Sequence, residues 1–386
     1  MKILFIVSDA NCKGGTEILA YNLLHELNRN GLECKLLSRW IYTGDDPDVI
    51  SLPADKAARY CKLVNSPVDK ICGHMFSDAF IKKEIEKIAL EGDFDWIVNH
   101  TYDLCAAIPQ TGGIKTAQIF NWSIPGYEKV LAGNISAKGA LRSFVPLLAF
   151  RALRNRWHKS LGEFTKLVML TDSAHQEIRD DDGTIALDRV ITIPDPLMQK
   201  EGSKVLTSLH NKNVVFVGRL SHEKGVMRLL RIWEHVSKHL SGYTLSIYGK
   251  GDVEREMRSW LAVRGEGLEN SVKFMGFCND LAEIYTHADL LLMTSDSEGF
   301  GMVLIEAMYY GVPCITFDCP VSPKEIIADA GIAVPCFDEE RYADEVIKLL
   351  REPERMKVLQ KRSIERAKDY YIDKVIVLWM AMFNQK

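Results

Sequence analysis

Residues 290–306 read LLLMTSDSEGFGMVLIE. The first four of them are apolar without polar alternation, which is typical of a buried parallel strand. A glycine-containing turn follows at 295–301, and an apolar helix is predicted from about residue 302. Glycine lets a ligand approach the backbone, and the free N–H groups at a helix start attract anions. The run therefore predicts a strand, turn and helix of an α/β fold, with a ligand-binding turn between them.

Two carboxylates bracket this turn. Glu298 lies in the turn, and Glu306 lies about one turn into the predicted helix. Carboxylates accept hydrogen bonds from hydroxyls while helix-start amides face phosphate, so the pair suits a ligand that carries both groups. Ordinary helix-start chemistry explains the same residues, because acidic side chains are favoured near the positive end of the helix dipole. The turn alone favours neither interpretation.

Similar apolar runs alternate with helical patterns along the whole chain. The strands predicted in the first half are Ile3–Val7, Cys34–Leu37, Trp96–Asn99, Thr116–Phe120, Leu167–Leu170 and Val190–Ile193. Those predicted in the second half are Val214–Val217, Thr244–Ile247, Val272–Met275, Leu290–Met293, Cys314–Phe317 and Ile332–Val334. This alternation predicts two Rossmann-like, doubly wound parallel-sheet domains that face a central cleft. The linker is predicted at Pro194-Asp195-Pro196, because proline stiffens the backbone and polar residues follow.

The bulk composition narrows the classes of protein. The chain has 386 residues, is 47% hydrophobic and 26% charged, and carries a net charge of −4, so it has no general attraction to nucleic acid. Its nine cysteines follow no metal-ligand spacing, which indicates reduced thiols and no metal. No apolar run approaches 18 residues, and the predicted strand at residues 2–7 leaves no room for a leader. We expect a cytoplasmic protein, at most peripheral on the cytoplasmic face of the membrane.

Two cations follow another predicted strand. Arg219 and Lys224 lie directly after Val214–Val217, on a loop that should open at the same sheet edge as Glu298. Arginine and lysine together can neutralise a diphosphate, although a solvated basic loop is the commoner explanation of two such residues. A third turn, Gly14-Gly15, follows the first strand and can offer backbone N–H groups to an anion. No GxGxxG or Walker lysine pattern is present, which argues against simple dinucleotide or P-loop binding.

Taken together, these motifs resemble glycosyltransferase family 4, a retaining, metal-independent group with the GT-B fold. The resemblance covers nearly the whole chain, from Gly14-Gly15 through Val217-Gly218-Arg219-Leu220 and Glu223-Lys224-Gly225 to Glu298 and Glu306, which are separated by seven residues. It implies an acceptor-binding domain over 1–196 and a donor-binding domain over 197–365. A final helix within 366–386 would pack back on the first domain.

The resemblance also implies roles for individual residues, none of which is a cofactor ligand. Arg219 and Lys224 would hold the donor diphosphate and stabilise the charge on the leaving group. Glu298 would bind hydroxyls of the transferred sugar and would act in catalysis with the two cations. Gly15 would add a backbone N–H from the other domain, and Glu306 would bind ribose. The remaining donor contacts would be Gly249 and Phe277 beside the base, with Gly299, Phe300 and Gly301 in the turn.

The sequence departs from the family pattern at three positions: Asn121, Asp195, where the family commonly has asparagine, and Ser322. Asn121 stands where the family often has a histidine, and an asparagine can hydrogen-bond a sugar but cannot carry charge. His100 follows a neighbouring strand and is a candidate for contacting the acceptor or the sugar, although a lone histidine is more often structural. The segment Ser322-Pro323-Lys324-Glu325 resembles one found in members that use UDP-hexose or UDP-N-acetylhexosamine, with serine in place of glycine. It favours a UDP-sugar donor.

A basic stretch bears on the acceptor. Residues 136–166 contain seven Lys or Arg and a single acid. A basic amphipathic helix there, with Arg151, Arg154, Trp157 and Lys159, suits an anionic lipid surface. A helix that packs its apolar face on the sheet explains the pattern equally well.

The sequence therefore predicts a glycosyltransferase that moves a hexose or N-acetylhexosamine from a nucleotide-diphosphate sugar, with UDP favoured, to a glycan acceptor in polysaccharide biosynthesis. The basic stretch favours a lipid-linked acceptor. Two alternatives stay open: a nucleotide-sugar epimerase of the same fold, and a nucleotide-sugar-binding protein without turnover. The epimerase would need no acceptor, and the binding protein would bind the donor without converting it.

Overall fold

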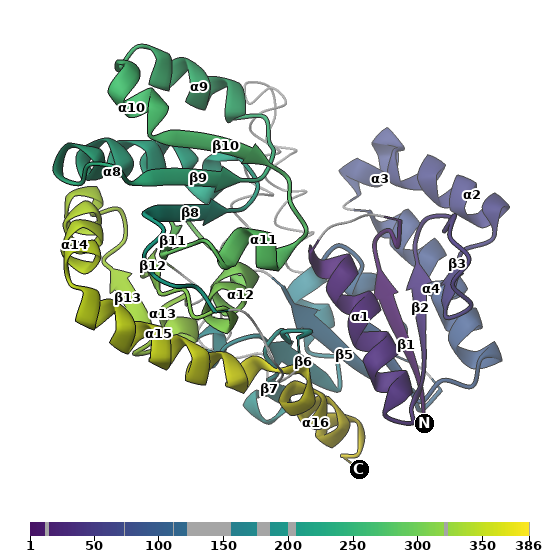
Figure 1. Cartoon of the computed structure of the whole chain (residues 1–386). Coiled ribbons are helices and arrows are strands. Elements are labelled where there is room, and N and C mark those ends of the chain that lie inside the picture. The colour runs from purple at the N-terminus through teal and green to yellow at the C-terminus, as the bar shows by residue number, and fades with distance from the viewer. Residues whose placement is uncertain are drawn as a thin grey trace. The chain divides into compact units, whose positions relative to one another are not determined.

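The computed structural model describes residues 1–11, 15–72, 74–110, 112–121, 156–175, 186–199, 206–319 and 323–385. The chain forms two compact units (Figure 1). The first comprises Met1–Pro196 together with Ile376–Lys386, and the second comprises Leu197–Val375. The segment that returns to the first unit begins at Ile376, ten residues later than the expected start at 366.

The first unit is built on a seven-stranded parallel sheet in the order β3-β2-β1-β4-β5-β6-β7. Its strands are β1 (Lys2–Val7), β2 (Glu33–Ser38), β3 (Val49–Ser51), β4 (Trp96–Asn99), β5 (Lys115–Phe120), β6 (Lys166–Met169) and β7 (Val190–Thr192). Its helices include α1 (Gly15–Arg29), α2 (Ala54–Val64), α3 (Pro67–Ile71) and α4 (Met75–Glu91). The strands are apolar because helices cover them, as in other parallel sheets.

The last helix, α16 (Ile372–Phe383), packs on the first sheet through its aromatic residues. Trp379 lies edge-on to Phe5 of β1 with 6.4 Å between ring centroids, and Phe383 lies 5.5 Å from Trp96 of β4. All four rings are almost fully buried. Burial of several large aromatic rings contributes a few kcal/mol each, so these contacts tie the end of the chain to the first sheet.

The second unit is built on a six-stranded parallel sheet in the order β10-β9-β8-β11-β12-β13. Its strands are β8 (Asn213–Val217), β9 (Thr244–Tyr248), β10 (Val272–Gly276), β11 (Leu290–Met293), β12 (Cys314–Phe317) and β13 (Gly331–Val334). Its helices are α8 (Val226–His239), α9 (Glu254–Ala262), α10 (Glu266–Asn270), α11 (Leu281–Tyr285), α12 (Met302–Tyr309), α13 (Pro323–Ile327), α14 (Glu339–Arg351) and α15 (Pro353–Ala367).

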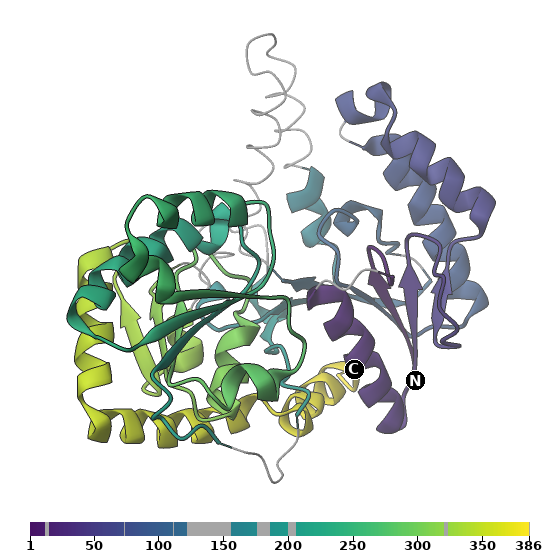
Figure 2. The same ribbon diagram turned by 45° about the horizontal axis from the view of Figure 1, so that its top comes forward.

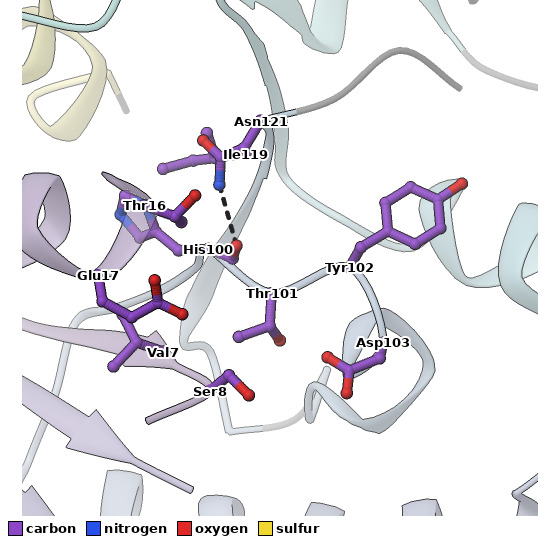
Figure 3. A pocket seen from close by; sticks show the side chains of 10 residues that line it. All are labelled: Val7, Ser8, Thr16, Glu17, His100, Thr101, Tyr102, Asp103, Ile119 and Asn121. Atoms are coloured by element: carbon purple, nitrogen blue, oxygen red, sulfur yellow. Dashed lines mark hydrogen bonds between the residues drawn. The ribbon is translucent and has the colours of Figure 1, made fainter. Parts of the chain in front are cut away.

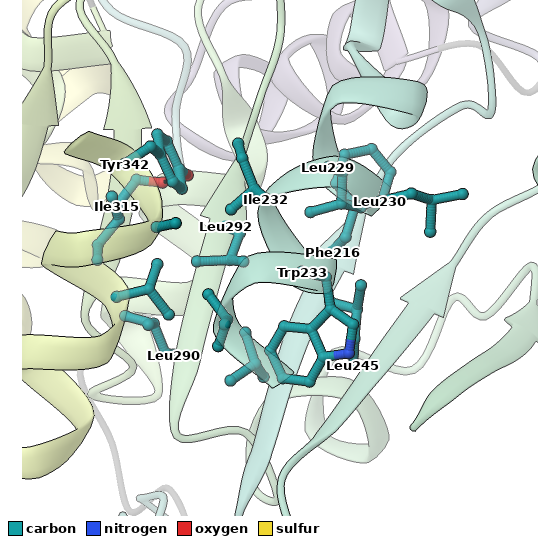
Figure 4. Packing of buried hydrophobic residues seen from close by; sticks show 14 of the residues in the cluster. Phe216, Leu229, Leu230, Ile232, Trp233, Leu245, Leu290, Leu292, Ile315 and Tyr342 are labelled. Carbon is teal, nitrogen blue, oxygen red and sulfur yellow. Dashed lines mark hydrogen bonds between the residues drawn. The ribbon is translucent and has the colours of Figure 1, made fainter. Parts of the chain in front are cut away.

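From β8 the chain adds β9 and β10 on one side of the sheet and then β11, β12 and β13 on the other. Right-handed crossovers in the two directions place helices on both faces of the sheet, as Figures 1 and 2 show. Trp233 of α8 is fully buried among Phe216, Leu245 and Leu290 (Figure 4), and its indole N–H donates to Ser271 Oγ at 3.0 Å. Tyr342 of α14 hydrogen-bonds the backbone at the end of β11. This core fixes the strand ends from which the loops with the predicted site residues begin.

The fold class predicted from the sequence is confirmed: each unit is an α/β domain with a parallel sheet. β3 was not predicted, because its three residues are too few for a pattern. Within the described ranges, no helix combines the length and apolarity needed to cross a membrane.

Candidate functional site

Two loops of the second unit contact each other at the carboxyl ends of neighbouring strands. One follows β8 and contains η3 (His222–Lys224); the other follows β11 and runs to the start of α12. Gly225 lies between η3 and α8 with φ +64, and a Cβ there would lie 1.9 Å from the carbonyl oxygen of Thr294. An L side chain is excluded at such a distance, so the glycine is what allows the two loops to touch.

Hydrogen bonds hold the two loops together. The Thr294 hydroxyl donates to the carbonyls of Lys224 and Gly225 at 3.1 and 3.2 Å. Arg228 of α8 donates to the Thr294 carbonyl at 2.8 Å and pairs with Asp296 at 2.9 Å. Thr294 and Arg228 were not predicted, because each acts through a residue some 70 positions away. Their contacts join the two loops into one platform.

The central pair on this platform is Lys224 and Glu298. Lys224 Nζ lies 2.8 Å from both carboxylate oxygens of Glu298, and the Ser295 hydroxyl also donates to that carboxylate. The side chain of Glu298 is 9% exposed and that of Lys224 is 23% exposed. The structure thus brings together two of the three residues predicted to be catalytic, in a partly buried, charge-neutral arrangement.

Arg219, the third of them, is placed differently. Its side chain is 63% exposed, and its guanidinium lies 3.5 Å from Glu223 one turn along the loop. An exposed ion pair of this kind holds a side chain only weakly. Arg219 therefore lies at the edge of the platform, where its side chain is free to turn toward a ligand.

Glu306 occupies the second turn of α12, as predicted. The Tyr285 hydroxyl donates to its carboxylate at 3.4 Å. Burial raises the pKa of Glu306 to about 7, and the Tyr285 hydrogen bond opposes this rise only partly. A carboxyl of this pKa exists in both protonation states near neutral pH.

The glycines of the second loop lie at the start of α12, and the ring of Phe300 between them is buried. Gly301 has φ +96 and caps the helix, and Gly299 is partly exposed. The Phe300 ring is 3% exposed and lies edge-on to Tyr370 at 5.6 Å. The ring is therefore held inside the second unit, and the donor contact of Phe300 stays a prediction, which its backbone N–H can fulfil.

The two predicted base contacts follow β9 and β10 at the same sheet edge. Gly249 has φ +144, and a Cβ there would lie 1.8 Å from the Gly218 carbonyl oxygen. Its N–H donates to the carbonyl of Gly276 at 2.7 Å. Phe277 is 68% exposed, which is unusual for a phenylalanine and leaves its ring available for stacking.

No three His, Cys, Asp or Glu residues gather into a possible metal site in the part of the chain that the structure describes. The eight described cysteines are free thiols.

The first unit contains a pocket of its own at the carboxyl ends of β1, β4 and β5 (Figure 3). Its volume is about 260 Å³. Ten of the described residues line it: Val7, Ser8, Thr16, Glu17, His100, Thr101, Tyr102, Asp103, Ile119 and Asn121. Asn121 donates to the His100 carbonyl at 3.0 Å, so the structure brings these two predicted residues together. Gly15 begins α1 beside this pocket's Thr16, with open space around its Cα; Gly14 lies outside the described residues.

The basic stretch is described in part. Arg151 and Arg154 lie outside the described residues, and Lys159 is exposed on the helical segment 156–161. Trp157 is 8% exposed and stacks on Tyr102 with 4.1 Å between ring centroids. Its predicted membrane contact is therefore corrected: the indole gains more by packing inside the first unit than by facing outward.

Known proteins resemble the chain in sequence and in fold. Residues 199–366 match the family described as Glycosyl transferases group 1. The chain is 24% identical to an uncharacterised glycosyltransferase of Haemophilus influenzae, over 98% of both proteins. Over 44% of its length it is 32% identical to AmsD, the amylovoran biosynthesis glycosyltransferase of Erwinia amylovora, of which the match covers 48%. A crystal structure of a TarM mutant of S. aureus, in complex with Fondaparinux, alpha-GlcNAc-glycerol and UDP, aligns over 100% of both chains with a TM-score of 0.75 at 13% identity.

These findings define the class of protein. The chain is a glycosyltransferase enzyme, and its two parallel-sheet units form a GT-B fold. The part that matches the group 1 glycosyltransferases lies in the second unit, which also carries the paired loops with Lys224 and Glu298.

Proposed function

We propose that the enzyme transfers a hexose or an N-acetylhexosamine from UDP to a lipid-linked glycan during polysaccharide synthesis, with retention of anomeric configuration. The observation that carries this proposal is the Lys224–Glu298 pair on the two hydrogen-bonded loops at the strand ends. A cation and an anion held together there can separate onto a ligand that has both phosphates and hydroxyls.

The donor would exchange partners with this pair. Lys224 would leave Glu298 for an oxygen of the diphosphate, and the freed carboxylate would accept hydrogen bonds from hydroxyls of the sugar. Arg219 would turn from Glu223 to the same diphosphate, because its present ion pair is weak and exposed. Glu306 would bind the ribose, and the Phe277 ring would stack on the base.

Transfer would then proceed at the face from which the diphosphate leaves. The acceptor oxygen forms a bond to the anomeric carbon while the bond from that carbon to the phosphate oxygen breaks, and its electron pair stays on the phosphate. The acceptor proton passes to the leaving phosphate. Lys224 and Arg219 stabilise the charge that builds on this group, which is the main electrostatic contribution of a preorganised site. No nucleophilic side chain is required.

UDP is favoured by two observations. The TarM structure, whose fold the chain shares, is a UDP complex. Pro323, Lys324 and Glu325 begin α13 directly beyond β12, so the segment that resembles one in UDP-sugar enzymes lies at the strand-end edge of the same sheet.

A thermal-shift series tests the donor assignment. A UDP-sugar at 100 times its Kd adds about 2.7 kcal/mol of stability, which should raise the melting temperature by roughly 5–10 °C. GDP- and ADP-sugars should shift it less. Lys224→Ala should abolish the shift, while Lys348→Ala, which removes an exposed lysine of α14, should preserve it. A wild-type enzyme that responds to no nucleotide, or a Lys224→Ala variant that responds fully, would overturn the assignment.

Transfer and its stereochemistry need a separate assay. Incubation with the stabilising UDP-sugar and lipid-linked glycans should give a product whose new linkage has the donor's anomeric configuration by NMR. Binding to a membrane surface is tested by flotation with anionic liposomes at low salt. The wild type should float with the liposomes, and the double variant Arg151→Glu/Arg154→Glu should float less. A product with the opposite anomeric configuration would exclude a retaining mechanism. A wild-type enzyme that does not float would exclude binding to an anionic lipid surface.

A further inference from the structure

Two cysteines of the second unit follow the ends of the neighbouring strands β12 and β13. The strands pair in parallel up to Phe317 and Val334, and the Asp318 N–H continues the ladder by donating to the Val334 carbonyl at 2.8 Å. Cys319 and Cys336 each come two residues after this last pair. The Cys336 thiol donates to the Asp318 carbonyl at 2.8 Å. Since a carbonyl oxygen lies about 2.8 Å from the next Cα along a trans peptide, the Cys336 sulfur lies within about 5.6 Å of the Cys319 Cα.

This separation suits a disulfide bond. Adjacent strands lie about 4.8 Å apart, which is inside the span of about 4.4–6.8 Å between the Cα atoms of bonded cysteines. Both residues are free thiols, and they differ in access: Cys336 is exposed and Cys319 is buried. An oxidant in solution can therefore reach the first thiol, and the second is placed to close the bond from inside.

The buried thiol lies near the central pair of the platform. The pKa of Cys319 is raised to about 12, chiefly by burial and then by the charges of Glu298 and Cys336, while Lys224 opposes the rise. Charges in salt solution are screened over about 10 Å. Cys319 therefore has both Cys336 and the Lys224–Glu298 pair in its surroundings.

The turn that carries Cys336 contacts a residue that joins the two loops. Phe337 has φ +66, a conformation that costs a residue with a side chain about 1–2 kcal/mol. The guanidinium of Arg228 lies 4.5 Å from the centroid of the Phe337 ring. Arg228 in turn bonds the Thr294 carbonyl and Asp296. A movement of this strained turn would therefore reach the contact between the loops.

We propose that Cys319 and Cys336 form a reversible disulfide when the enzyme meets a small-molecule disulfide, and that this bond loosens the contact between the two loops. Cys319 is confined by its burial, so the exposed turn must move when the Cys336 sulfur leaves the Asp318 carbonyl for its partner. Phe337 would move with the turn and withdraw from Arg228.

The oxidant is a low-molecular-weight disulfide such as oxidised glutathione. The Cys336 thiolate attacks one of its sulfurs, the S–S bond of the oxidant breaks, and one glutathione leaves as a thiolate that takes up a proton. The Cys319 thiolate then attacks the Cys336 sulfur of the mixed disulfide and releases the second glutathione. The protein loses two protons and two electrons, and the oxidant gains them. Burial and Asp318 raise the pKa of Cys336 although Arg228 opposes this, so the reaction should accelerate as pH rises.

Peptide mapping of the full chain tests the bond. After treatment with oxidised glutathione at mildly alkaline pH, digestion without reductant should yield a peptide pair that joins Cys319 to Cys336 and is two hydrogens lighter than its reduced parts. Dithiothreitol should separate the pair. Cys336→Ser should lose it, whereas Cys61→Ser, at an exposed cysteine of α2, should keep it. A wild type that never forms this cross-link would overturn the proposal.

Hydrogen exchange tests the effect on the loops without a nucleotide. The Asp296 N–H donates to the Glu223 carbonyl at 2.8 Å and thereby bonds one loop to the other. This amide should exchange about tenfold faster in the cross-linked enzyme than in the reduced one, because local opening becomes easier. Cys336→Ser treated with the same oxidant should exchange at the reduced rate. An unchanged rate in the cross-linked enzyme would show that the bond does not act on the loops.

The consequence for the donor rests on the proposed function, because looser loops would hold Lys224 and Glu298 less well. Calorimetry should show that UDP binds the cross-linked enzyme about fivefold or more weakly, with recovery after dithiothreitol. If UDP binds both forms equally, the coupling to the donor site is wrong and the donor assignment stands. If UDP binds neither form, the proposed function is wrong, while the cross-link and the exchange rate still decide this inference.

Discussion

Lys224 and Glu298 are 74 residues apart in the chain, yet the ammonium of one lies 2.8 Å from both carboxylate oxygens of the other. Both belong to loops at the ends of the adjacent strands β8 and β11. In the absence of a donor, each charge is neutralised by the other.

Glu298→Gln should separate donor binding from transfer. The amide cannot hold Lys224 as the carboxylate does, so Lys224 is free for the diphosphate, and the affinity for UDP should stay equal or rise. Transfer should fall at least 100-fold, because the charged partner of the sugar hydroxyls is lost. Calorimetry with UDP and a transfer assay measure the two effects. A parallel loss of both would show that Glu298 acts only by holding the loops.

Gly225→Ala should destabilise the second unit by several kcal/mol. The new methyl would lie 1.9 Å from the Thr294 carbonyl oxygen at a φ of +64, so the two loops must move apart. Gly267→Ala is the matched control, because its Cβ would meet no atom within 4 Å and it lies in helix α10. That variant should change the free energy of unfolding by at most about 1 kcal/mol. Urea unfolding measures both, and equal effects would contradict the close contact described here.

Glu306→Gln should change how stability depends on pH. A carboxyl whose folded pKa is raised from 4.5 to about 7 stabilises the fold fully below pH 4.5, and this contribution is lost as pH rises through 7. The unfolding free energy of the wild type should therefore fall relative to that of Glu306→Gln between pH 5 and 7, by at most about 1.4 kcal/mol per pH unit. Parallel pH profiles would exclude the raised pKa.

His100→Phe should remove a pH dependence of opposite sign. The folded pKa is lowered from 6.5 to about 3, so the unfolded chain binds the extra proton between these values. Stability from this group is complete above pH 6.5 and declines as pH falls toward 3. Between pH 6 and 5 the wild type should lose up to about 1.4 kcal/mol more than His100→Phe does. An imidazole that titrates normally would give no difference.

Arg39→Met should destabilise the first unit. Arg39 pairs with Asp103 and donates to Ser8, and its guanidinium lies 5.4 Å from the centroid of the Trp40 ring. Removal of this largely buried partner leaves hydrogen bonds unmade, which costs about 1–3 kcal/mol. Arg39→Lys should restore part of the free energy of unfolding, and urea unfolding measures both variants. Equal free energies of unfolding in the methionine and lysine variants would contradict the role of the charge at this position.

The fold was predictable because each buried strand is a short apolar run next to a helical pattern, as in Leu290–Met293 before α12. The placement of Glu298, Lys224 and Glu306 at one sheet edge followed from the rule for parallel strands. Which side chains of the two loops bond to each other was not predictable. The bond between Lys224 and Glu298 depends on two loops meeting in space, which no local pattern records.

The burial of individual side chains was not predictable either. Phe300 lies in a loop whose neighbours contact solvent, and nothing in its spacing reveals that Tyr370 buries it. Trp157 lies on a basic helix, and its stacking on Tyr102 depends on a distant strand end. Arg39 was not predicted, because a single arginine after a strand belongs to no recognisable motif. In the structure it is largely buried and bonds Asp103 and Ser8.

Phe277 has a consequence for how such enzymes diversify. The ring that would stack on the base is 68% exposed, while the neighbouring Gly249 is confined by a backbone oxygen. Substitutions at Phe277 remove little buried surface, so under the proposed stacking they would alter the choice of nucleotide at almost no cost to folding. On that proposal, preference for a base would change in evolution, or by design in the laboratory, independently of the rest of the fold.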